Sequence, residues 1–272
     1  MVSGKKESVI SNQYCSPTNL LLFTSYVLPL TSYFYLIYSF NVAKKLFVQD
    51  GIEFIRLSAN ENQMKIVIFG ASGATGHHLV SQALRSDHSV TAFVRNASKL
   101  RADDVNIKIF NGDVTDYQCV EDAVTNQEVV LSALGASNPF KRDFKLITGI
   151  QNIVTAMMKQ KVRRFIYQSF LGVQENRGEL GFVINAVIPV ILKNVISDHE
   201  AKENIIMESG LDWTIVRCPM LTNGSFTGKY RTGEHVKSSS IIPLISRADV
   251  SDFMLKQITD KKYVHKKPRI MY

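Results

Sequence analysis

Glycines at a fixed spacing carry the clearest chemical signal in this chain. Gly70, Gly73 and Gly76 form a G-x-x-G-x-x-G pattern within KIVIFGASGATGHHLV, which runs from Lys65 to Val80. A glycine after a buried strand permits a tight turn, the next lets backbone N–H groups approach a pyrophosphate, and the third permits close helix–strand packing. The helix N-terminus that follows offers unsatisfied amide groups to an anion. The pattern predicts a dinucleotide-binding loop; a glycine-rich turn without a ligand is the alternative.

Cations after the second expected strand indicate which dinucleotide would bind. An NAD-specific site commonly carries Asp or Glu there, which accepts hydrogen bonds from the ribose 2′-OH. In this chain FVRNASKL places Arg95 at the strand end and Lys99 one helical turn further on. A planar guanidinium together with an ammonium suits a 2′-phosphate, so these residues predict NADPH as the cofactor. Two solvated surface cations are the alternative.

Two polar residues further along could act on a nicotinamide. Ser169 ends the expected strand RRFIYQSF, at the sheet edge where the nicotinamide would lie, although a serine there could simply close a turn. His199, in SDHEAK, is expected in the first turn of an amphipathic helix. It could donate a proton near neutral pH, and a packing or surface role is the alternative. The spacing Tyr-x-x-x-Lys occurs only at Tyr263 to Lys267, in a basic C-terminal run, and is assigned no role.

The elements that must position these residues alternate along the chain. Short β-branched runs are separated by longer helix-compatible stretches; the runs are KIVIFG, SVTAFVR, NIKIFNGDV, QEVVLSALG, RRFIYQSF and DWTIVR. Such alternation predicts right-handed βαβ units and a parallel sheet, and the apolar continuity suits strands covered on both faces. We therefore expect a single Rossmann-like α/β domain, with a doubly wound parallel sheet, over residues 64–272.

Residues 1–63 have a different character and form an N-terminal extension. No charged residue occurs between Glu7 and Lys44, and the apolar segment 20–40 is long enough to cross a bilayer. Pro29 and several polar residues weaken that reading. A membrane anchor on the cytoplasmic side and a leader without stable structure both remain open. Contact with a membrane is expected only through this segment.

Charge and cysteine content restrict the partners and the compartment. The net charge of +8 favours anionic partners, but the dense run DKKYVHKKPR (260–269) reads as a solvated tail without a nucleic-acid motif. Nucleic-acid binding is therefore not expected. The three cysteines lack a C-x-x-C pair, which favours a reducing, cytoplasmic compartment. The histidines never adopt the spacing of zinc ligands, so no metal site is expected.

Several motifs together resemble a known family. They are IFGASGATG, VTAFVRNASKL, NGDVTD, NIVTAMMKQKVRRFIYQS, SDHEAKENIIMESGLDWTIV, FTGKYRTGE and SRADVSDFML, which cover nearly everything after Met64. The glycine loop is shared widely, whereas the DHE…SGLDWTIV block and its RADVSDFML sequel are more specific. The chain resembles the atypical short-chain dehydrogenase/reductases of the NmrA-like, NAD(P)H-binding group. Within that group it is similar to the biliverdin-IXβ reductases, also called NADPH-dependent flavin reductases.

The resemblance implies a set of cofactor contacts. They are Gly70, Ser72, Gly73, Ala74, Thr75, Gly76, Arg95, Asp113, Val114, Leu134 and Gly135. Asp113 could accept hydrogen bonds near the adenine, or it could be a turn residue that caps the next helix. The resemblance also supports Ser169 and His199 as active-site residues. One position departs from the pattern, because Met220 stands where those reductases carry a histidine. This departure puts activity on tetrapyrroles in doubt.

These patterns lead to a functional expectation. The apolar stretch 180–196 is either a lid over an apolar pocket or ordinary core, and both favour a planar aromatic acceptor. We expect an NADPH-dependent oxidoreductase that transfers hydride to a flavin-like, quinone or other conjugated small molecule. The alternative is an NADP-binding redox sensor or assembly factor without turnover. A monomer or a weak homo-oligomer is expected.

Overall fold

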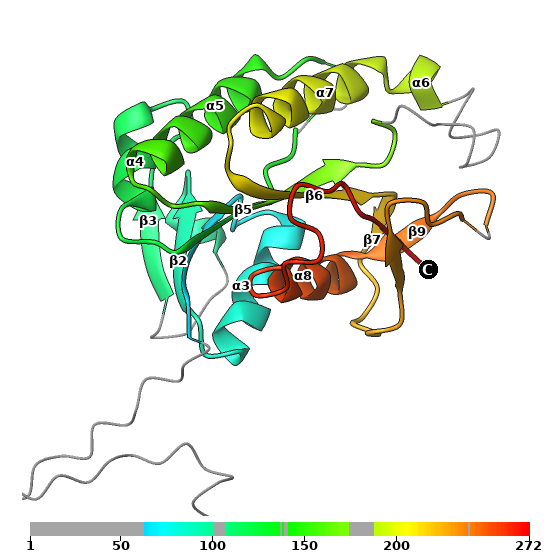
Figure 1. The fold of residues 1–272 in the computed structure, drawn as a ribbon, viewed down its shortest axis with the longest axis horizontal. Coiled ribbons are helices and arrows are strands. Elements are labelled where there is room, and N and C mark those ends of the chain that lie inside the picture. The colour runs from blue at the N-terminus through cyan, green and yellow to red at the C-terminus, as the bar shows by residue number, and fades with distance from the viewer. Residues whose placement is uncertain (1–62, 101–106, 137, 139–140, 174–187, 239) are drawn as a thin grey trace, which may run out of the picture. The chain divides into compact units, whose positions relative to one another are not determined.

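A largely parallel eight-stranded sheet forms the centre of the fold, in the order β3-β2-β1-β4-β5-β6-β10-β8 (Figure 1). Its strands are β1 (Lys65–Phe69), β2 (Ser89–Val94), β3 (Ile107–Asn111), β4 (Val129–Ser132), β5 (Arg164–Phe170), β6 (Asp212–Cys218), β8 (Arg231–Gly233) and β10 (Arg269–Met271). In this sheet β8 runs antiparallel to β10. The order confirms the predicted doubly wound α/β fold, in which the chain leaves β1 toward β2 and β3 and then returns to β4.

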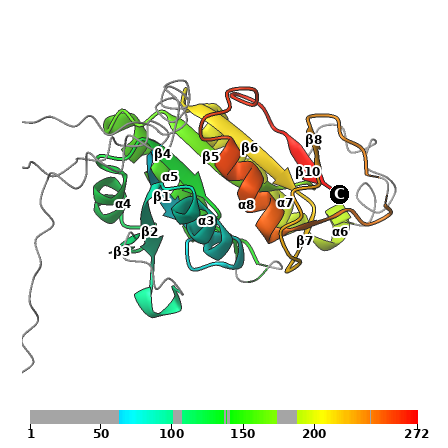
Figure 2. The ribbon, with the colours of Figure 1, turned by 90° about the horizontal axis from the view of Figure 1, so that it is seen from below.

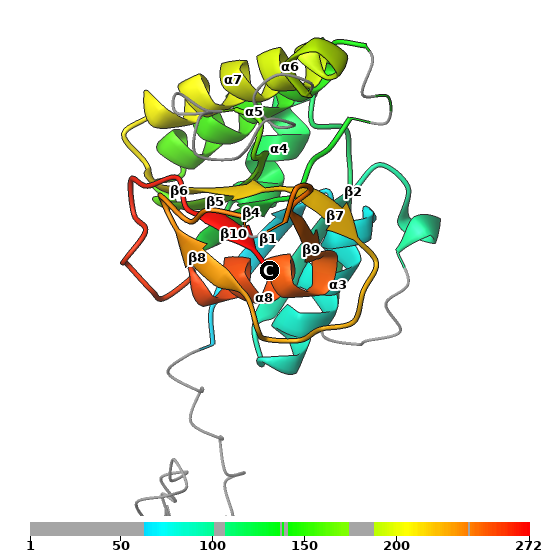
Figure 3. The same cartoon turned by 90° about the vertical axis from the view of Figure 1, so that its right-hand side faces the viewer.

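Helices cover both faces of the sheet, as Figures 2 and 3 show. On one face lie α3 (Ala74–Arg85) and α8 (Arg247–Lys256), and on the other lie α4 (Tyr117–Val124), α5 (Phe144–Lys159) and α7 (Lys193–Met207). The short helices η1 (Ala97–Lys99) and α6 (Ile188–Ile191), and the pair β7 (Met220–Thr222) and β9 (Leu244–Ser246), complete the described elements.

Alternation along β1 divides the apolar core into two layers. Ile66 and Ile68 pack in the layer that contains residues of α3 and α8, whereas Val67 and Phe69 pack in the layer of α4, α5 and α7. Side chains of a strand point alternately to opposite faces, so a continuous apolar run serves both layers. The edge strand β3 departs from the prediction, since Ile109 is 44% exposed. An edge strand lacks a second neighbour and is covered less completely.

The computed structural model describes residues 63–100, 107–136, 138, 141–173, 188–238 and 240–272. All of them belong to one compact unit, Asn62–Tyr272. The apolar segment 20–40 lies outside the described residues, so the membrane anchor and the boundary at Met64 stay predictions. Among the described residues, no helix combines the length and the apolar character that crossing a membrane requires.

The basic C-terminal run is not the solvated tail that its composition predicted. Tyr263 is buried, and its carbonyl oxygen accepts a hydrogen bond of 2.7 Å from the Thr214 hydroxyl. Further along, the amide of Arg217 donates to the carbonyl of Pro268 at 2.9 Å. The run thereby leads β10 into the sheet beside β6. The prediction was wrong because it weighed the lysines, which stay at the surface, and overlooked the buried residues between them.

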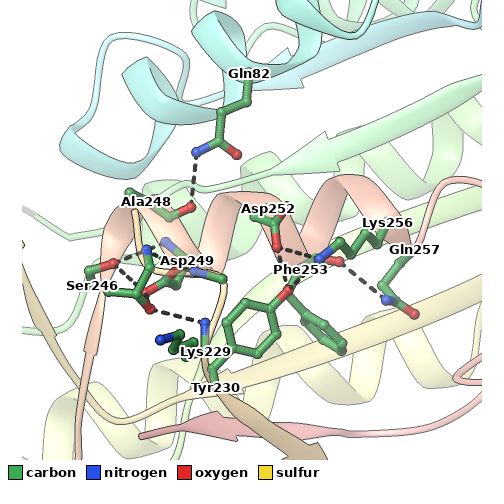
Figure 4. A network of polar contacts seen from close by, with 12 residues as sticks. Gln82, Lys229, Tyr230, Ser246, Ala248, Asp249, Asp252, Phe253, Lys256 and Gln257 are labelled. Carbon is green, nitrogen blue, oxygen red and sulfur yellow. Dashed lines mark hydrogen bonds and ion pairs between the residues drawn. The ribbon is translucent and has the colours of Figure 1, made fainter. Parts of the chain in front are cut away.

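A buried carboxylate ties the C-terminal segments to α8 (Figure 4). Asp249 accepts hydrogen bonds from the amides of Thr227 and Gly228, both at 2.9 Å. It also accepts hydrogen bonds from the hydroxyls of Ser246 at 3.0 Å and Tyr272 at 2.6 Å. Burial disfavours the charged form, but these hydrogen bonds outweigh it and hold the pKa of Asp249 below its ordinary value of 3.8. One carboxylate therefore links the FTGK and RADV motifs and the chain end.

We expect Asp249→Asn to lower the free energy of unfolding by about 2–3 kcal/mol, because an amide cannot accept all of these hydrogen bonds. Urea unfolding at neutral pH measures the loss. The matched control is Asp252→Asn on the same helix, whose carboxylate pairs with Lys256 and accepts a hydrogen bond from the Tyr230 hydroxyl. An amide oxygen can still accept from Tyr230, so this variant should lose only the ion pair with the exposed Lys256, less than about 1 kcal/mol.

A second expectation concerns pH. Since the pKa of Asp249 is lowered on folding, its contribution is complete above 3.8 and is lost as the pH falls below that value. The difference between the wild type and Asp249→Asn should therefore shrink on acidification. A difference that is equal at neutral and acidic pH would contradict the role given to this carboxylate.

Candidate active site

A cavity of about 420 Å³ opens at the carboxyl ends of β1, β4 and β5. It lies where the strand order reverses between β1 and β4, which is where open α/β sheets bind ligands. Of the predicted site residues, the cavity brings together Gly73, Ala74, Thr75, Leu134, Gly135, Ser169 and His199. Residues from the glycine loop and from the expected nicotinamide end thus share one cavity.

The glycine loop has the geometry that its spacing suggested. Gly70 follows β1 with φ at +80°, and a Cβ there would lie 2.8 Å from the carbonyl oxygen of Ala133. A Cβ at Gly76 would overlap the carbonyl oxygen of Gly70, so the first turn of α3 lies directly against the loop. Both close approaches require glycine. They hold the helix N-terminus at the cavity.

The start of α3 can accept an anion. Its N-cap is Gly73, and no side chain caps the first turn, which contains no acidic residue. Amide groups at a helix start lack intrahelical partners and favour a phosphate. Gly73, Ala74 and Thr75 line the cavity, whereas Ser72 lies on the loop outside its lining. The residues present therefore fit the pyrophosphate of a dinucleotide.

Of the two cations predicted to bind a 2′-phosphate, Lys99 lies at a second cavity, of about 760 Å³. Lys99 lines it together with Ala74, His77 and Ser98. Arg95 directly follows β2 and is exposed, but it does not line this cavity or the first one. His77 and Ser98 were missed by sequence reasoning, since only the fold brings α3 next to η1. An adenosine phosphate would have a polar and basic surface here.

Asp113 closes a turn after β3. It accepts hydrogen bonds from the amide of Thr115 at 2.9 Å and from its hydroxyl at 2.7 Å. These bonds, with the charge of Arg95 nearby, lower the pKa of the Asp113 carboxyl. The cap of α4 is Asp116, so the alternative in which Asp113 caps that helix was wrong. Val114 is buried against α5 and lines neither cavity.

Ser169, His199 and Tyr167 form a hydrogen-bonded cluster at the cavity. Nδ1 of His199 lies 3.1 Å from the hydroxyl of Tyr167 and 3.3 Å from that of Ser169. Ser169 donates its proton to Glu203 at 2.5 Å. The Tyr167 side chain is fully buried, and burial raises the pKa of its hydroxyl, which keeps its proton. Among the described residues the acceptor for that proton is His199 Nδ1, so Nε2 carries the hydrogen.

The surroundings of His199 favour its neutral form, not the charged acid that its residue type suggested. Burial, with the charge of Lys202 nearby, holds the pKa of His199 well below its ordinary 6.5. The imidazole is therefore neutral at pH 7 and can donate a hydrogen bond through Nε2 to a ligand in the cavity. The helix begins at Lys193, so His199 lies within α7 rather than in its first turn. The predicted helix start was wrong because the helix begins without a side-chain cap, so the sequence carries no capping residue that marks Lys193 as its first residue.

A buried ion pair lies behind the cluster. Arg217 on β6 donates to both carboxylate oxygens of Glu203, at 2.6 and 3.3 Å. Glu203 is 1% exposed and Arg217 is 7% exposed. The same carboxylate accepts the Ser169 proton, so the pair fixes the orientation of the serine. This chain of contacts runs from the sheet to the cavity.

Part of this cluster was absent from the sequence prediction. His199, Lys202 and Glu203 have helical spacing and so lie on one side of α7. This spacing of charged residues before SGLDWT was an available signal. Tyr167 and Arg217 gave none, because each contacts α7 only after the sheet has formed.

Other predicted features lie away from the cavity or fall on residues that the structure does not describe. Met220, which replaces a histidine of the resembled reductases, is 57% exposed on β7 and does not line the cavity. Residues 180–187 of the apolar stretch 180–196 lie outside the described residues, so the choice between lid and core stays open. Among the described residues no cluster of His, Cys, Asp or Glu suits a metal ion.

A comparison with known protein families identifies the family of this chain. Residues 70–261 match the NAD(P)H-binding family. The chain belongs to that family. The resemblance to the NAD(P)H-binding group is thereby confirmed, and the finer likeness to the biliverdin-IXβ reductases stays a prediction.

Two curated relatives illustrate the range of the NAD(P)H-binding family. An uncharacterized chloroplastic protein of Arabidopsis thaliana is 30% identical over 60% of this chain and 61% of its own length. The photosystem II assembly factor Ycf39 of Cyanophora paradoxa is 23% identical over 73% of this chain and 60% of its own length. The chain thus spans about three fifths of these relatives.

Solved structures share the fold at low identity. A short-chain dehydrogenase/reductase from Veillonella parvula in complex with NADP has a TM-score of 0.64 at 22% identity. The alignment covers 76% of this chain and 94% of that one. An oxidoreductase from Lactococcus lactis has a TM-score of 0.64 at 21% identity, covering 76% of this chain and 90% of that one. This protein therefore has an NAD(P)H-binding, oxidoreductase-like fold.

Proposed function

We propose that this NAD(P)H-binding protein is an NADPH-dependent reductase that transfers hydride to a flavin-like, quinone or other conjugated acceptor. The observation that carries the proposal is one cavity lined both by the uncapped start of α3 and by Ser169 and His199. A cofactor whose pyrophosphate lies at the helix start would extend its nicotinamide along the carboxyl ends of β4 and β5. Lys99 and Arg95 support NADPH over NADH.

Bound NADPH supplies the hydride. The amides at Ala74 and Thr75 would bind the pyrophosphate, and the residues after β4 would border the nicotinamide. The Nε2 hydrogen of neutral His199 would orient an acceptor through a hydrogen bond. Tyr167 orients His199 by donating to Nδ1, and Ser169, whose own proton goes to Glu203, lies 3.3 Å from the same nitrogen and borders the acceptor. The protein thereby holds two planar rings in contact, which is its main contribution to such a transfer.

The test is oxidation of NADPH by the purified full chain, monitored at the nicotinamide absorbance against a panel of flavins, quinones and biliverdin. We expect turnover with at least one planar acceptor. Tight NADPH binding without turnover across the panel would contradict the reductase. It would favour the alternative below.

Ser169→Ala should slow turnover by about 10- to 100-fold, because small misplacements of an active-site group have effects of this size. The affinity for NADPH should hardly change, since the phosphates provide most of the binding. The matched control is Ser132→Ala, a buried serine at the end of β4 whose hydroxyl has no partner within the described chain. Full activity of Ser169→Ala would reduce Ser169 to a structural residue.

The alternative is an NADP-binding sensor or assembly factor that binds a protein without turnover. It is supported by the similarity to Ycf39, whose name describes an assembly factor. The lack of Tyr-x-x-x-Lys on α7 also supports it. The acceptor panel separates the two proposals.

A further inference from the structure

Lys202 is a buried lysine at the cavity that the proposed transfer has not used. The residue is only 2% exposed, yet it lines the 420 Å³ cavity one helical turn from His199. Its ammonium group makes no hydrogen bond or ion pair with any residue of the described chain. A buried charge without a partner is unfavourable, so a ligand that brings an oxygen acceptor would supply what this site lacks.

The carboxylates that face Lys202 are already engaged elsewhere. Asp198 accepts hydrogen bonds from Arg142 at 2.9 Å and from the amide of Asp143 at 2.7 Å. Glu203 is paired with Arg217. Asp143, the N-cap of α5, also acts on the charge of Lys202. These charges favour the ammonium form without binding it directly.

We propose that Lys202 is the proton donor for a conjugated carbonyl acceptor whose oxygen lies between Lys202 Nζ and His199 Nε2. This inference rests on the proposed reductase function and names its substrate class. Hydride leaves C4 of the reduced nicotinamide and forms a bond to carbon, either at the carbonyl carbon or at the far end of the conjugated system. The π electrons move to the carbonyl oxygen, which takes a proton from the ammonium group. The products are an alcohol or enol, the oxidised nicotinamide and a neutral amine, which solvent protonates again.

The electrostatics agree with this role. Burial lowers the pKa of Lys202 to about 8, against the opposing charges of Asp198, Asp143 and Glu203. An acid with a pKa near the working pH transfers its proton more readily than an ordinary lysine. Since the ammonium form is needed, turnover should fall as the pH rises through about 8. His199 stays neutral over that range and does not add a second step.

The test uses 4-nitrophenol, whose phenolate mimics the oxyanion of the transfer and absorbs visibly, so it requires no turnover. The full chain is titrated with the probe in the presence and absence of NADP⁺. We expect the wild type to bind the phenolate and to lower the pKa of the bound phenol. Lys202→Gln should bind it at least tenfold more weakly. The matched control is Lys193→Gln, an exposed lysine at the start of the same helix.

Lys202→Arg separates the charge from the proton. An arginine keeps the positive charge but does not release a proton near neutral pH, so phenolate binding should persist while turnover of a carbonyl acceptor falls at least tenfold. Added methylamine should partly restore turnover in Lys202→Ala. Equal phenolate affinity in the wild type and Lys202→Gln would overturn the proposal, as would a wild type that does not bind the probe. If the wild type does not bind NADP⁺ at all, that result would instead contradict the proposed function itself.

Discussion

Glu203→Gln is expected to lower the free energy of unfolding by about 3–5 kcal/mol, because it leaves the Arg217 charge buried without a counter-ion. Both side chains are almost fully inaccessible to solvent, and their shortest contact is 2.6 Å. Urea unfolding, with the slope checked for two-state behaviour, measures the loss. The variant should also lose turnover, since Ser169 donates to the same carboxylate.

A double variant controls for this loss. Replacing both partners, as Glu203→Leu with Arg217→Met, removes the unpaired charge and should recover most of the stability. It should not recover activity, because Ser169 would still lack its acceptor. If the free energy of unfolding of Glu203→Gln lies within about 1 kcal/mol of the wild-type value, water or another group must compensate the Arg217 charge. The ion pair would then not be what holds Ser169 in place.

Arg95→Ala is expected to weaken NADPH binding by about 10- to 150-fold and NADH binding little. One hydrogen bond to a charged group contributes about 1.5–3 kcal/mol, and the planar guanidinium can bind a phosphate with two donors. Lys99→Ala should have a smaller effect, because an ammonium is a mobile point charge. Titrations of both nucleotides at low and high salt measure the preference, which added salt should reduce.

The structure supports the assignment of Arg95 to the 2′-phosphate less well than that of Lys99. Its side chain lines neither cavity, whereas Lys99 and Ser98 line the second one. A larger loss of NADPH affinity in Lys99→Ala than in Arg95→Ala would move the 2′-phosphate toward η1. Equal affinity of the wild type for NADPH and NADH would contradict the assignment of both cations.

The features that could be predicted from the sequence are local ones. The glycine loop lies within one strand–turn–helix unit, so the requirement for glycine at Gly76 can be deduced from neighbours in the chain, whereas the close approach of Ala133 to Gly70 depends on the pairing of β4 with β1. Parallel βαβ units follow from the alternation of apolar runs. Ser169 could be predicted at the carboxyl edge of the sheet because it ends an apolar run, whereas His199 was predicted only as a proton donor at the start of a helix.

The features that could not be predicted depend on contacts between distant segments. The tautomer of His199 follows from Tyr167, which lies 32 positions away in the chain. The partner of Glu203 is on the next strand, and Lys202 became notable only once its lack of a partner was visible. The basic C-terminal run was misread for a similar reason, because its place beside β6 is set by the hydrogen-bonding needs of a strand edge.

Direct hydride transfer from bound NADPH is the central claim, and an isotope measurement tests it. NADPH deuterated at one or the other face of C4 is oxidised by the full chain with an active acceptor, and the rates are compared with those of unlabelled NADPH. We expect oxidation to slow with one of the two labels, because the proposed pose would direct one face of the nicotinamide toward Ser169 and His199. Tight binding of NADPH with no oxidation by any acceptor, or oxidation insensitive to both labels, would contradict the account.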